Sequence, residues 1–158
     1  MKNYNVVAMK RNTTEFLILD LEGKDKAEML MNVSRFAVNK GLVRDAEVLY
    51  QKFLARERER GIAVVPNIAF PEAYGIEMSR PYAFILCRTQ QTVMFERADT
   101  GVRIILVSLF CGRTDTACIR VIAKLSKLLR SQRFCEDFLK AKSEDEVYRA
   151  MARLEEIQ

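Results

Sequence analysis

Histidine is absent from this chain of 158 residues, and no two of its four cysteines form a C-x-x-C pair. Zinc sites in proteins usually draw on histidine or on closely spaced cysteine pairs. The cysteines are Cys87, Cys111, Cys118 and Cys135, at spacings unlike those of zinc knuckles. The sequence therefore predicts no metal and no cofactor, and it favours reduced thiols that pack as small apolar side chains.

Long apolar stretches are missing as well. The longest near-continuous one, Ile104 to Cys111, is far too short to span a bilayer, and Met1 to Asn5 lack the apolar core of a signal peptide. An apolar fraction of 49% and a charged fraction of 30% are ordinary for a globular protein. We expect a cytoplasmic chain without membrane insertion, folded as a single domain over residues 1–158.

A run of charge of one sign is the third absence. The net charge is +5, but basic residues alternate with acidic ones, as they do from Arg56 to Arg60. Proteins that bind nucleic acid usually present a stripe of positive charge, often with aromatic residues between the cations. The sequence instead predicts a solvated surface of mixed charge on which Glu57, Arg58 and Glu59 have no special role, and it predicts no nucleic-acid partner.

The apolar residues that are present predict strands mixed with helices. Strands are predicted at 16–20, 62–65, 82–87 and 103–110, the last buried on both faces. Helices are predicted over 24–39, over about 45–58, through 119–129, from Ser131 onward and from Ser143 onward. Together these elements predict a layered α/β domain.

Polar residues and glycines mark the expected ends of these elements. Asp25 with Glu28, and Ser143 with Glu146, are typical of capping pairs at a helix start. The first two helices are expected to end at Gly41 and Gly61. The first helix is predicted to bury Ala27, Leu30, Val33, Phe36 and Ala37, and a turn is predicted at Asp99-Thr100-Gly101.

One segment carries a family resemblance. Residues 56–72 read R-E-R-E-R-G-I-A-V-V-P-N-I-A-F-P-E. This is similar to the "R-E … G-I-A-I-P-H" signature of the fructose/mannitol-type and nitrogen-regulatory type IIA domains of the bacterial phosphoenolpyruvate-dependent sugar phosphotransferase system. Stretches at Lys24–Gly41, Phe95–Val107 and Phe138–Tyr148 resemble further family motifs in the same order, so the resemblance covers roughly residues 15 to 155.

The resemblance implies a five-stranded mixed sheet flanked by α-helices on both faces. It also implies a site in which one histidine carries the phosphoryl group, a second histidine faces it, and an arginine supports it. Carried over residue by residue, the arginine is retained as Arg56, the phosphoacceptor position holds Glu72, and the second histidine position holds Cys118. The glycine and small polar positions before the acceptor have also changed, and Pro66 there removes one N–H donor.

Glu72 therefore has three interpretations. It is a surface carboxylate without a role, a fixed negative charge that pairs with Arg56 and partly imitates the phosphorylated state, or an acceptor that forms an acyl phosphate. Cys118 is either a reactive thiolate at a helix N-terminus or a packed thiol. Arg56 either retains an anion-supporting role or belongs to a surface lattice with Glu59 and Arg60.

The leading functional hypothesis is a degenerate type IIA domain that is not itself an enzyme. It would act as a regulatory or docking module for a protein partner, such as a phosphotransferase component, a transporter or a kinase. One alternative is a working phosphocarrier that uses Glu72 or Cys118. Another is a small-anion sensor anchored at Arg56. A homodimer is also compatible with the sequence.

Overall fold

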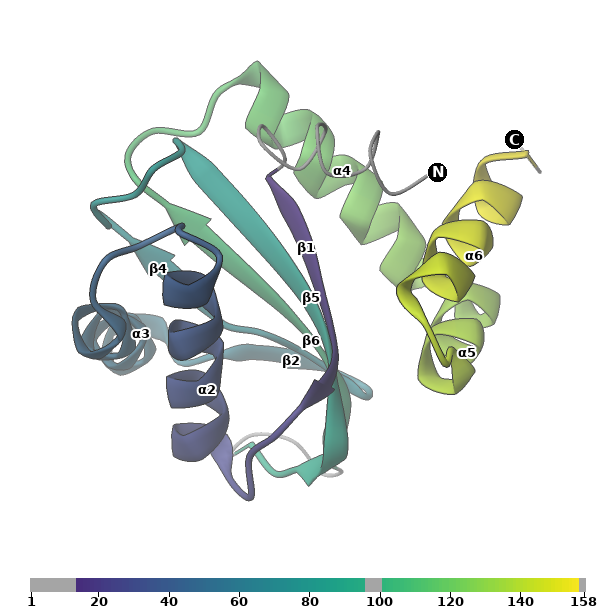
Figure 1. Ribbon diagram of the computed structural model, residues 1–158, viewed down its shortest axis with the longest axis horizontal. Coiled ribbons are helices and arrows are strands. Elements are labelled where there is room, and N and C mark those ends of the chain that lie inside the picture. Colours follow the sequence, from purple (N-terminus) through teal and green to yellow (C-terminus); the bar gives the residue numbers. More distant parts are fainter. Residues whose placement is uncertain (1–13, 96–100, 157–158) are drawn as a thin grey trace. The chain divides into compact units, whose positions relative to one another are not determined.

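The computed structural model describes residues 14–95 and 101–156. Its contacts divide the chain into two compact units, Met1–Gly112 and Arg113–Gln158. Among these described residues, the first unit holds the sheet and two helices, and the second holds three helices (Figure 1). The elements are β1 (Glu15–Leu21), α2 (Lys26–Asn39), α3 (Ala46–Arg60), β2 (Ala63–Val65), β3 (Ile68–Phe70), β4 (Glu72–Tyr74), β5 (Tyr82–Val93), β6 (Val102–Phe110), α4 (Thr116–Arg130), α5 (Gln132–Lys140) and α6 (Glu144–Glu156).

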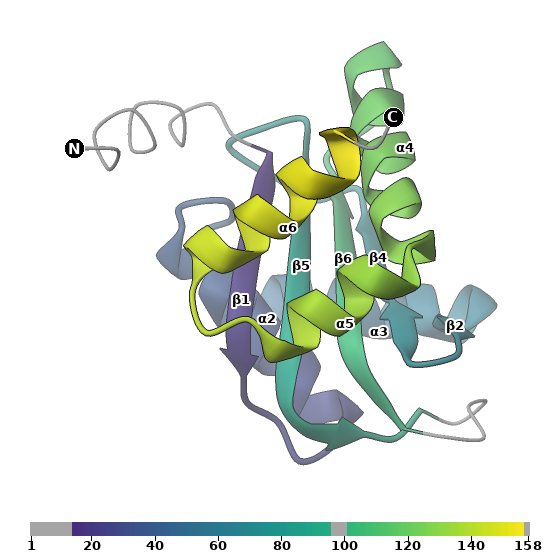
Figure 2. The same ribbon diagram turned by 90° about the vertical axis from the view of Figure 1, so that its right-hand side faces the viewer.

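The sheet is mixed, as the sequence predicts. Its order is β1-β5-β6-β3-β2, and β4 pairs with β6 (Figure 2). The β1–β5, β3–β6 and β4–β6 pairs are parallel, whereas the β5–β6 and β2–β3 pairs are antiparallel. The α/β fold class is thereby confirmed.

The short strands β3 and β4 continue one another along β6. Ile68 pairs with Ile104 and Glu72 pairs with Ser108, so the register is the same for both. Pro71 lies between them and cannot donate a ladder hydrogen bond, although its carbonyl accepts from the Ser108 N–H at 3.0 Å. Six strand segments therefore occupy five positions across the sheet. Neither segment was predicted, because each is short and is defined by its pairing with β6, which local periodicity does not reveal.

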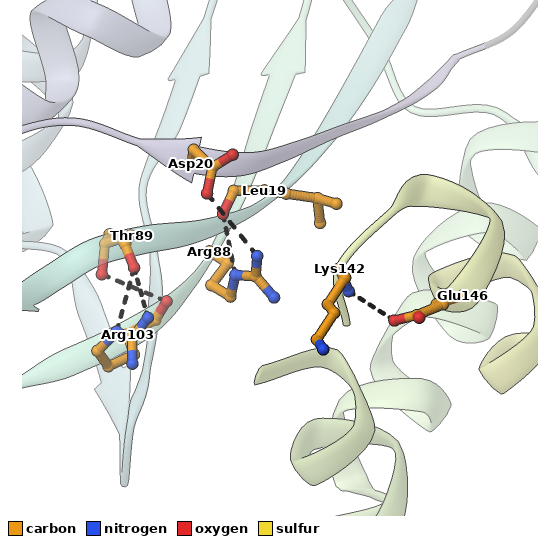
Figure 3. Close-up of polar contacts among 7 residues, drawn as sticks. All are labelled: Leu19, Asp20, Arg88, Thr89, Arg103, Lys142 and Glu146. Carbon is orange, nitrogen blue, oxygen red and sulfur yellow. Dashed lines mark hydrogen bonds and ion pairs between the residues drawn. The ribbon is translucent and has the colours of Figure 1, made fainter. Parts of the chain in front are cut away.

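Two arginines supply hydrogen bonds where strand pairing becomes irregular (Figure 3). The β1–β5 register shifts between Ile18 and Leu21, and there Arg88 Nε donates to the Leu19 carbonyl at 2.9 Å. The β5–β6 register shifts beyond Arg88, and there Arg103 Nε and Nη2 donate to the Thr89 carbonyl at 3.1 and 2.8 Å. These side chains satisfy carbonyls at points where the ladder shifts.

The helix α2 begins and ends as predicted. The Asp25 carboxylate accepts from the Glu28 N–H at 2.9 Å, and Gly41 follows the helix with φ of 72°. Leu30, Val33 and Ala37 are buried. Ala27 is exposed, contrary to prediction, because it lies in the first turn at the edge of the buried stripe, whereas Met29 is buried instead.

The core of the first unit lies between the two helices and one face of the sheet. The helices contribute Met29, Leu30, Val33, Leu49 and Phe53 to it, and the central strands contribute Ile85, Cys87, Ile105, Val107 and Leu109. Alternate residues of the same strands, including Phe84 and Ile104, point to the opposite face and are also buried. The prediction that 103–110 is buried on both faces is therefore confirmed.

The second unit consists of three capped helices. The side chains of Asp115 and Ser131 accept from N–H groups in the first turns of α4 and α5. Ser143 accepts from the Glu146 N–H at 3.3 Å, but the Glu146 carboxylate accepts from Lys142 N–H (Figure 3). The predicted capping box therefore has one of its two hydrogen bonds, because Glu146 accepts from Lys142 N–H and not from Ser143 N–H. Phe134 and Phe138 stack with ring centroids 5.9 Å apart.

One further prediction falls partly outside the described residues, and two others concern a membrane span and a metal site. The turn at Asp99-Thr100-Gly101 includes Asp99 and Thr100, which lie outside the described residues. Over residues 14–95 and 101–156, none of the helices is both long enough and apolar enough to cross a membrane. Over the same ranges, no three cysteine or acidic side chains gather into a possible metal site.

Candidate functional site

Arg56 and Glu72 form an ion pair between α3 and β4. The distance from Arg56 Nη2 to Glu72 Oε1 is 3.5 Å. The Arg56 side chain is 20% exposed and that of Glu72 is 36% exposed, so the pair lies where the core meets solvent. The structure therefore brings together two of the three residues that the sequence singles out.

Tyr74 completes the surroundings of the Glu72 carboxylate. Its hydroxyl donates to Glu72 Oε2 at 2.8 Å, so each carboxylate oxygen has its own partner. The Arg56 guanidinium carbon lies 4.7 Å from the centroid of the Tyr74 ring, which is the geometry of a cation–π contact. Tyr74 in turn stacks on Phe110, with centroids 4.7 Å apart and an interplanar angle of 16°.

The local fold explains this arrangement. Successive side chains of a strand point to opposite faces, so Glu72 and Tyr74 share one face while Ala73 between them is fully buried. The register with β6 places Tyr74 directly beside Phe110. Tyr74 was not predicted as a site residue from the sequence. The available signal was its two-residue spacing from Glu72, which has meaning only once the strand is known.

Arg56 has a second acidic neighbour and an unused donor. Its Nη1 lies 3.7 Å from Glu59, one turn further along α3, and its buried Nε has no hydrogen-bond partner among the described residues. Lys52 lies one turn earlier on the same helix. Its Nζ is close to Gly75, at 3.9 Å from the position that a Cβ would occupy there. Two cations of α3 thus border the end of β4, and only Arg56 is engaged by Glu72.

The electrostatics of the cluster affect Tyr74 most clearly. Burial raises the pKa of the Tyr74 hydroxyl, and the hydrogen bond to Glu72 and its negative charge raise it further. Arg56 acts in the opposite direction and offsets part of this effect. Tyr74 is therefore a protonated donor to Glu72 at neutral pH, and the carboxylate is held by a phenol and a guanidinium together.

Glu57 does not belong to a merely solvated face, which corrects the sequence-based expectation. Its carboxylate pairs with Lys26 and joins α3 to α2, and both side chains are more than four-fifths buried. The two residues line a cavity of about 400 Å³ together with Leu54, Arg58, Gly61, Ile62 and Phe95. On α3, Arg56 therefore pairs with a residue of β4, whereas Glu57 pairs with a residue of α2.

Cys118 belongs to the C-terminal unit, in the first turn of α4. Its side chain is fully buried, and its N–H donates to the Asp115 carboxylate at 2.8 Å. Burial raises the pKa of the Cys118 thiol, and the negative charge of Asp115 raises it further. A helix N-terminus ordinarily lowers a thiol pKa, but here the capping carboxylate and burial outweigh it. The geometry favours a packed thiol over a reactive thiolate.

The other thiols are also free. Burial raises the pKa of both Cys87 and Cys135, whereas Cys111 is exposed. Cys111 is the exception to the expectation that the cysteines pack as small apolar side chains.

Comparison with known families decides the identity of this fold. The family model described as the phosphoenolpyruvate-dependent sugar phosphotransferase system, EIIA 2, matches residues 12–153. The chain belongs to this family. Among proteins with curated descriptions, none matches the chain.

Solved structures show the same EIIA type 2 fold at low sequence identity. The nitrogen regulatory protein IIA-Ntr from Neisseria meningitidis is 17% identical, with a TM-score of 0.69, over 91% of this chain and 99% of that one. IIA mannitol from Escherichia coli is 22% identical, with a TM-score of 0.67, over 85% of this chain and 94% of that one. The structure of IIA mannitol from Escherichia coli in a complex with phosphorylated enzyme IIB mannitol is also similar. It shows 22% sequence identity and a TM-score of 0.68, and the match covers 86% of this chain and 93% of that one.

Within this EIIA type 2 chain, the positions that the resemblance assigns to the two histidines have different surroundings. Glu72 lies in a polar cluster with Arg56 and Tyr74. Cys118 is enclosed and is protonated at neutral pH. Neither side chain offers the neutral imidazole on which phosphoryl relay by histidine depends.

Proposed function

We propose that this EIIA type 2 chain is a binding-only member of its family. It docks on a protein partner in the cytoplasm as a regulatory module, and it carries no phosphoryl group. The observation that carries the proposal is the engagement of both Glu72 oxygens, one by Arg56 and one by Tyr74. Glu72 thereby supplies a permanent negative charge at the position where relatives with histidine would gain charge on phosphorylation.

The chemistry of the Glu72 side chain supports a fixed charge that a partner recognises and that takes no part in phosphoryl transfer. A carboxylate carries less charge and fewer acceptor oxygens than a phosphoryl group, so the imitation is partial. Pairing with Arg56 fixes the direction of the carboxylate, and stacking on Tyr74 and Phe110 limits the movement of the pair. A partner that recognises the phosphorylated form of a relative would meet a similarly placed anion here.

The phosphocarrier alternative is less well supported by the geometry. An acyl phosphate on Glu72 would require one of its oxygens to leave Tyr74 or Arg56 before attack. Attack by Cys118 would require a thiolate from a fully buried thiol whose pKa is raised. Both routes begin with the loss of contacts that stabilise the fold.

The anion-sensor alternative has a similar difficulty. Arg56 would have to bind the ligand, but it already lies 3.5 Å from Glu72 and 3.7 Å from Glu59. A free anion would compete with two carboxylates tethered in the same chain, which act at high effective concentration. The docking function needs no such competition.

The first partners to test are the type IIB domain and the histidine phosphocarrier protein of the same organism. The complex of IIA mannitol with phosphorylated IIB mannitol motivates the first choice. Titration calorimetry would compare the wild-type chain with Glu72→Gln, which removes the charge but keeps the shape. We expect binding by the wild type and a loss of about tenfold in affinity for the variant, since a hydrogen-bonded charge contributes about 1.5 kcal/mol.

A matched control is Glu77→Gln, which removes an exposed carboxylate close in sequence to the site. This variant should bind within about twofold of the wild type, as expected for a surface charge outside the interface. Equal affinities for wild type and Glu72→Gln would contradict the role assigned to Glu72. Absence of binding to both proteins would contradict a docking role toward phosphotransferase components.

A further inference from the structure

The cavity that contains Glu57 lies within the first unit and shares no residue with the Glu72 cluster. Its volume of about 400 Å³ is within the range of about 300–1,000 Å³ that is common for small-molecule sites. The helices α2 and α3 lie side by side here (Figure 1), and Lys26 at the start of α2 is joined to Glu57 near the end of α3. Residues next to β2 and β5 complete the wall of the cavity.

The Glu57 carboxylate has one oxygen that is engaged and one that is not. Its Oε1 pairs with Lys26. Among the described residues, its Oε2 has no ion pair and no hydrogen bond, although the side chain is only 18% exposed. A carboxylate oxygen that is largely withdrawn from water favours a ligand that supplies a donor, such as an ammonium or a hydroxyl group.

Arg58 follows Glu57 directly and lines the same cavity, yet the two side chains do not pair with each other. Within residues 14–95 and 101–156, Arg58 forms no ion pair and no side-chain hydrogen bond. Arg56, on the same helix, differs because it contacts both Glu59 and Glu72. A guanidinium that no carboxylate of the chain engages is suited to the carboxylate of a ligand, which it can bind through two parallel hydrogen bonds.

The other side chains of the cavity are apolar. Phe95 is 4% exposed, and Leu54 and Ile62 are partly buried. Apolar walls with a few convergent polar groups are typical of sites for small organic molecules. The walls therefore favour a ligand whose uncharged part is a hydrocarbon rather than a sugar.

The ligand that fits these features has a charged donor, a carboxylate and an apolar body close together. In an α-amino acid the ammonium and the carboxylate are bonded to the same carbon, which suits two adjacent residues of opposite charge. An apolar carboxylic acid would leave Glu57 Oε2 without a donor, and an apolar amine would leave Arg58 without an acceptor. We propose that this cavity binds a free α-amino acid with a large apolar side chain. Its ammonium donates to Glu57 Oε2, and its carboxylate accepts from Arg58.

The site uses none of the residues assigned to docking, so the inference does not rest on the proposed function. The test is a titration of the full chain with L-leucine, followed by the NMR shifts of the Gly61 and Ile62 amides. We expect saturable shifts. Isocaproate is leucine without the ammonium, isoamylamine is leucine without the carboxylate, and glycine lacks the apolar side chain. Each should bind at least about tenfold more weakly than L-leucine.

The variant Arg58→Gln should bind L-leucine at least about tenfold more weakly, because it removes the charge that pairs with the carboxylate. The matched control is Arg60→Gln, at an exposed arginine of the same helix that does not line the cavity. This control should bind within about twofold of the wild type, and circular dichroism would verify that both variants fold.

A second variant, Glu57→Gln, should lose the preference for L-leucine over isocaproate, because it removes the charge that selects the ammonium. Three results would overturn the inference: no saturable shifts with L-leucine, binding of isocaproate as tight as that of L-leucine, or an equal loss in Arg58→Gln and Arg60→Gln.

Discussion

Glu72 and Cys118 occupy the two positions that the family resemblance assigns to histidine, and their surroundings differ. Glu72 is 36% exposed and charged, and Arg56 and Tyr74 each engage one of its oxygens. Cys118 is fully buried, and its thiol pKa is raised by burial and by Asp115. One position keeps a polar environment suited to an anion, whereas the other has become part of the packing.

This difference separates recognition from chemistry. Phosphoryl relay needs an available nucleophile and a positively charged environment around the transferring group. The position on β4 offers a charged environment without imidazole, and the position on α4 offers neither. A chain with these two properties is suited to presenting a fixed charge, which is the basis of the docking function proposed above.

The largest expected effect on the free energy of unfolding comes from placing glutamate at position 118 and cysteine at position 72. Cys118→Glu would place an unpaired carboxylate in a fully buried position next to Asp115, and we expect a loss of about 3 kcal/mol or more in the free energy of unfolding. Glu72→Cys, at a half-exposed position, should lose about 1 kcal/mol or less. Denaturant unfolding measures both. Similar losses for the two variants would show that the positions do not differ as described.

Thiol labelling sharpens the same comparison. The exposed Cys111 should react first with a thiol reagent, and Cys118 should react at least about a hundredfold more slowly, because its labelling requires local opening. Mass spectrometry of peptides after timed quenching gives the order of modification, with Cys111→Ser as the control that removes the fast phase. If Cys118 reacts as fast as Cys111, then the packed-thiol interpretation is wrong.

The Glu72 side of the comparison is tested by a double-mutant cycle. Arg56→Met and Glu72→Gln each remove the ion pair, and we expect a coupling of about 0.5–1 kcal/mol, since both side chains are partly exposed. Arg56→Met should also weaken the support of Tyr74, so its single effect should be the larger. The cycle is measured by urea unfolding at low and at high salt. A coupling of zero at low salt would leave Glu72 as an ordinary surface carboxylate.

The smallest effect concerns the pH dependence of stability. Because the pKa of Tyr74 is raised in the folded state, the folded chain holds this proton more tightly than the unfolded chain does. Its contribution to stability is complete below the ordinary tyrosine pKa of about 10 and is lost as pH rises through the folded value. Tyr74→Phe should flatten this alkaline decline, and Glu72→Gln should reduce it partly. Phenolate absorbance and unfolding at alkaline pH measure these effects.

Much of the fold follows from the sequence because its signals are local. Asp25, Gly41 and Ser131 mark helix ends through their own backbone and side-chain chemistry, and the apolar run at 103–110 identifies the central strand. The strands β3 and β4 were missed because they are defined by their pairing with β6. Such pairing is a long-range property that periodicity does not carry.

The residues of the candidate site also fall into those that the sequence predicted and those that only the strand pairing reveals. Pairing with Arg56 was one of the three interpretations of Glu72 that the sequence left open, and the structure brings the two side chains within 3.5 Å. Tyr74 and Phe110 were not predicted, because their roles depend on the register between β4 and β6.

The central claim is that the chain presents a fixed charge and accepts no phosphoryl group. Intact-protein mass spectrometry tests it after incubation with phosphoenolpyruvate, enzyme I and the histidine phosphocarrier protein, with a histidine-bearing type IIA domain in the same tube. The account predicts that the histidine-bearing domain gains a phosphoryl group while this chain keeps its mass. A gain of one phosphoryl group by this chain, lost in Glu72→Gln or in Cys118→Ser, would contradict the account and identify the acceptor.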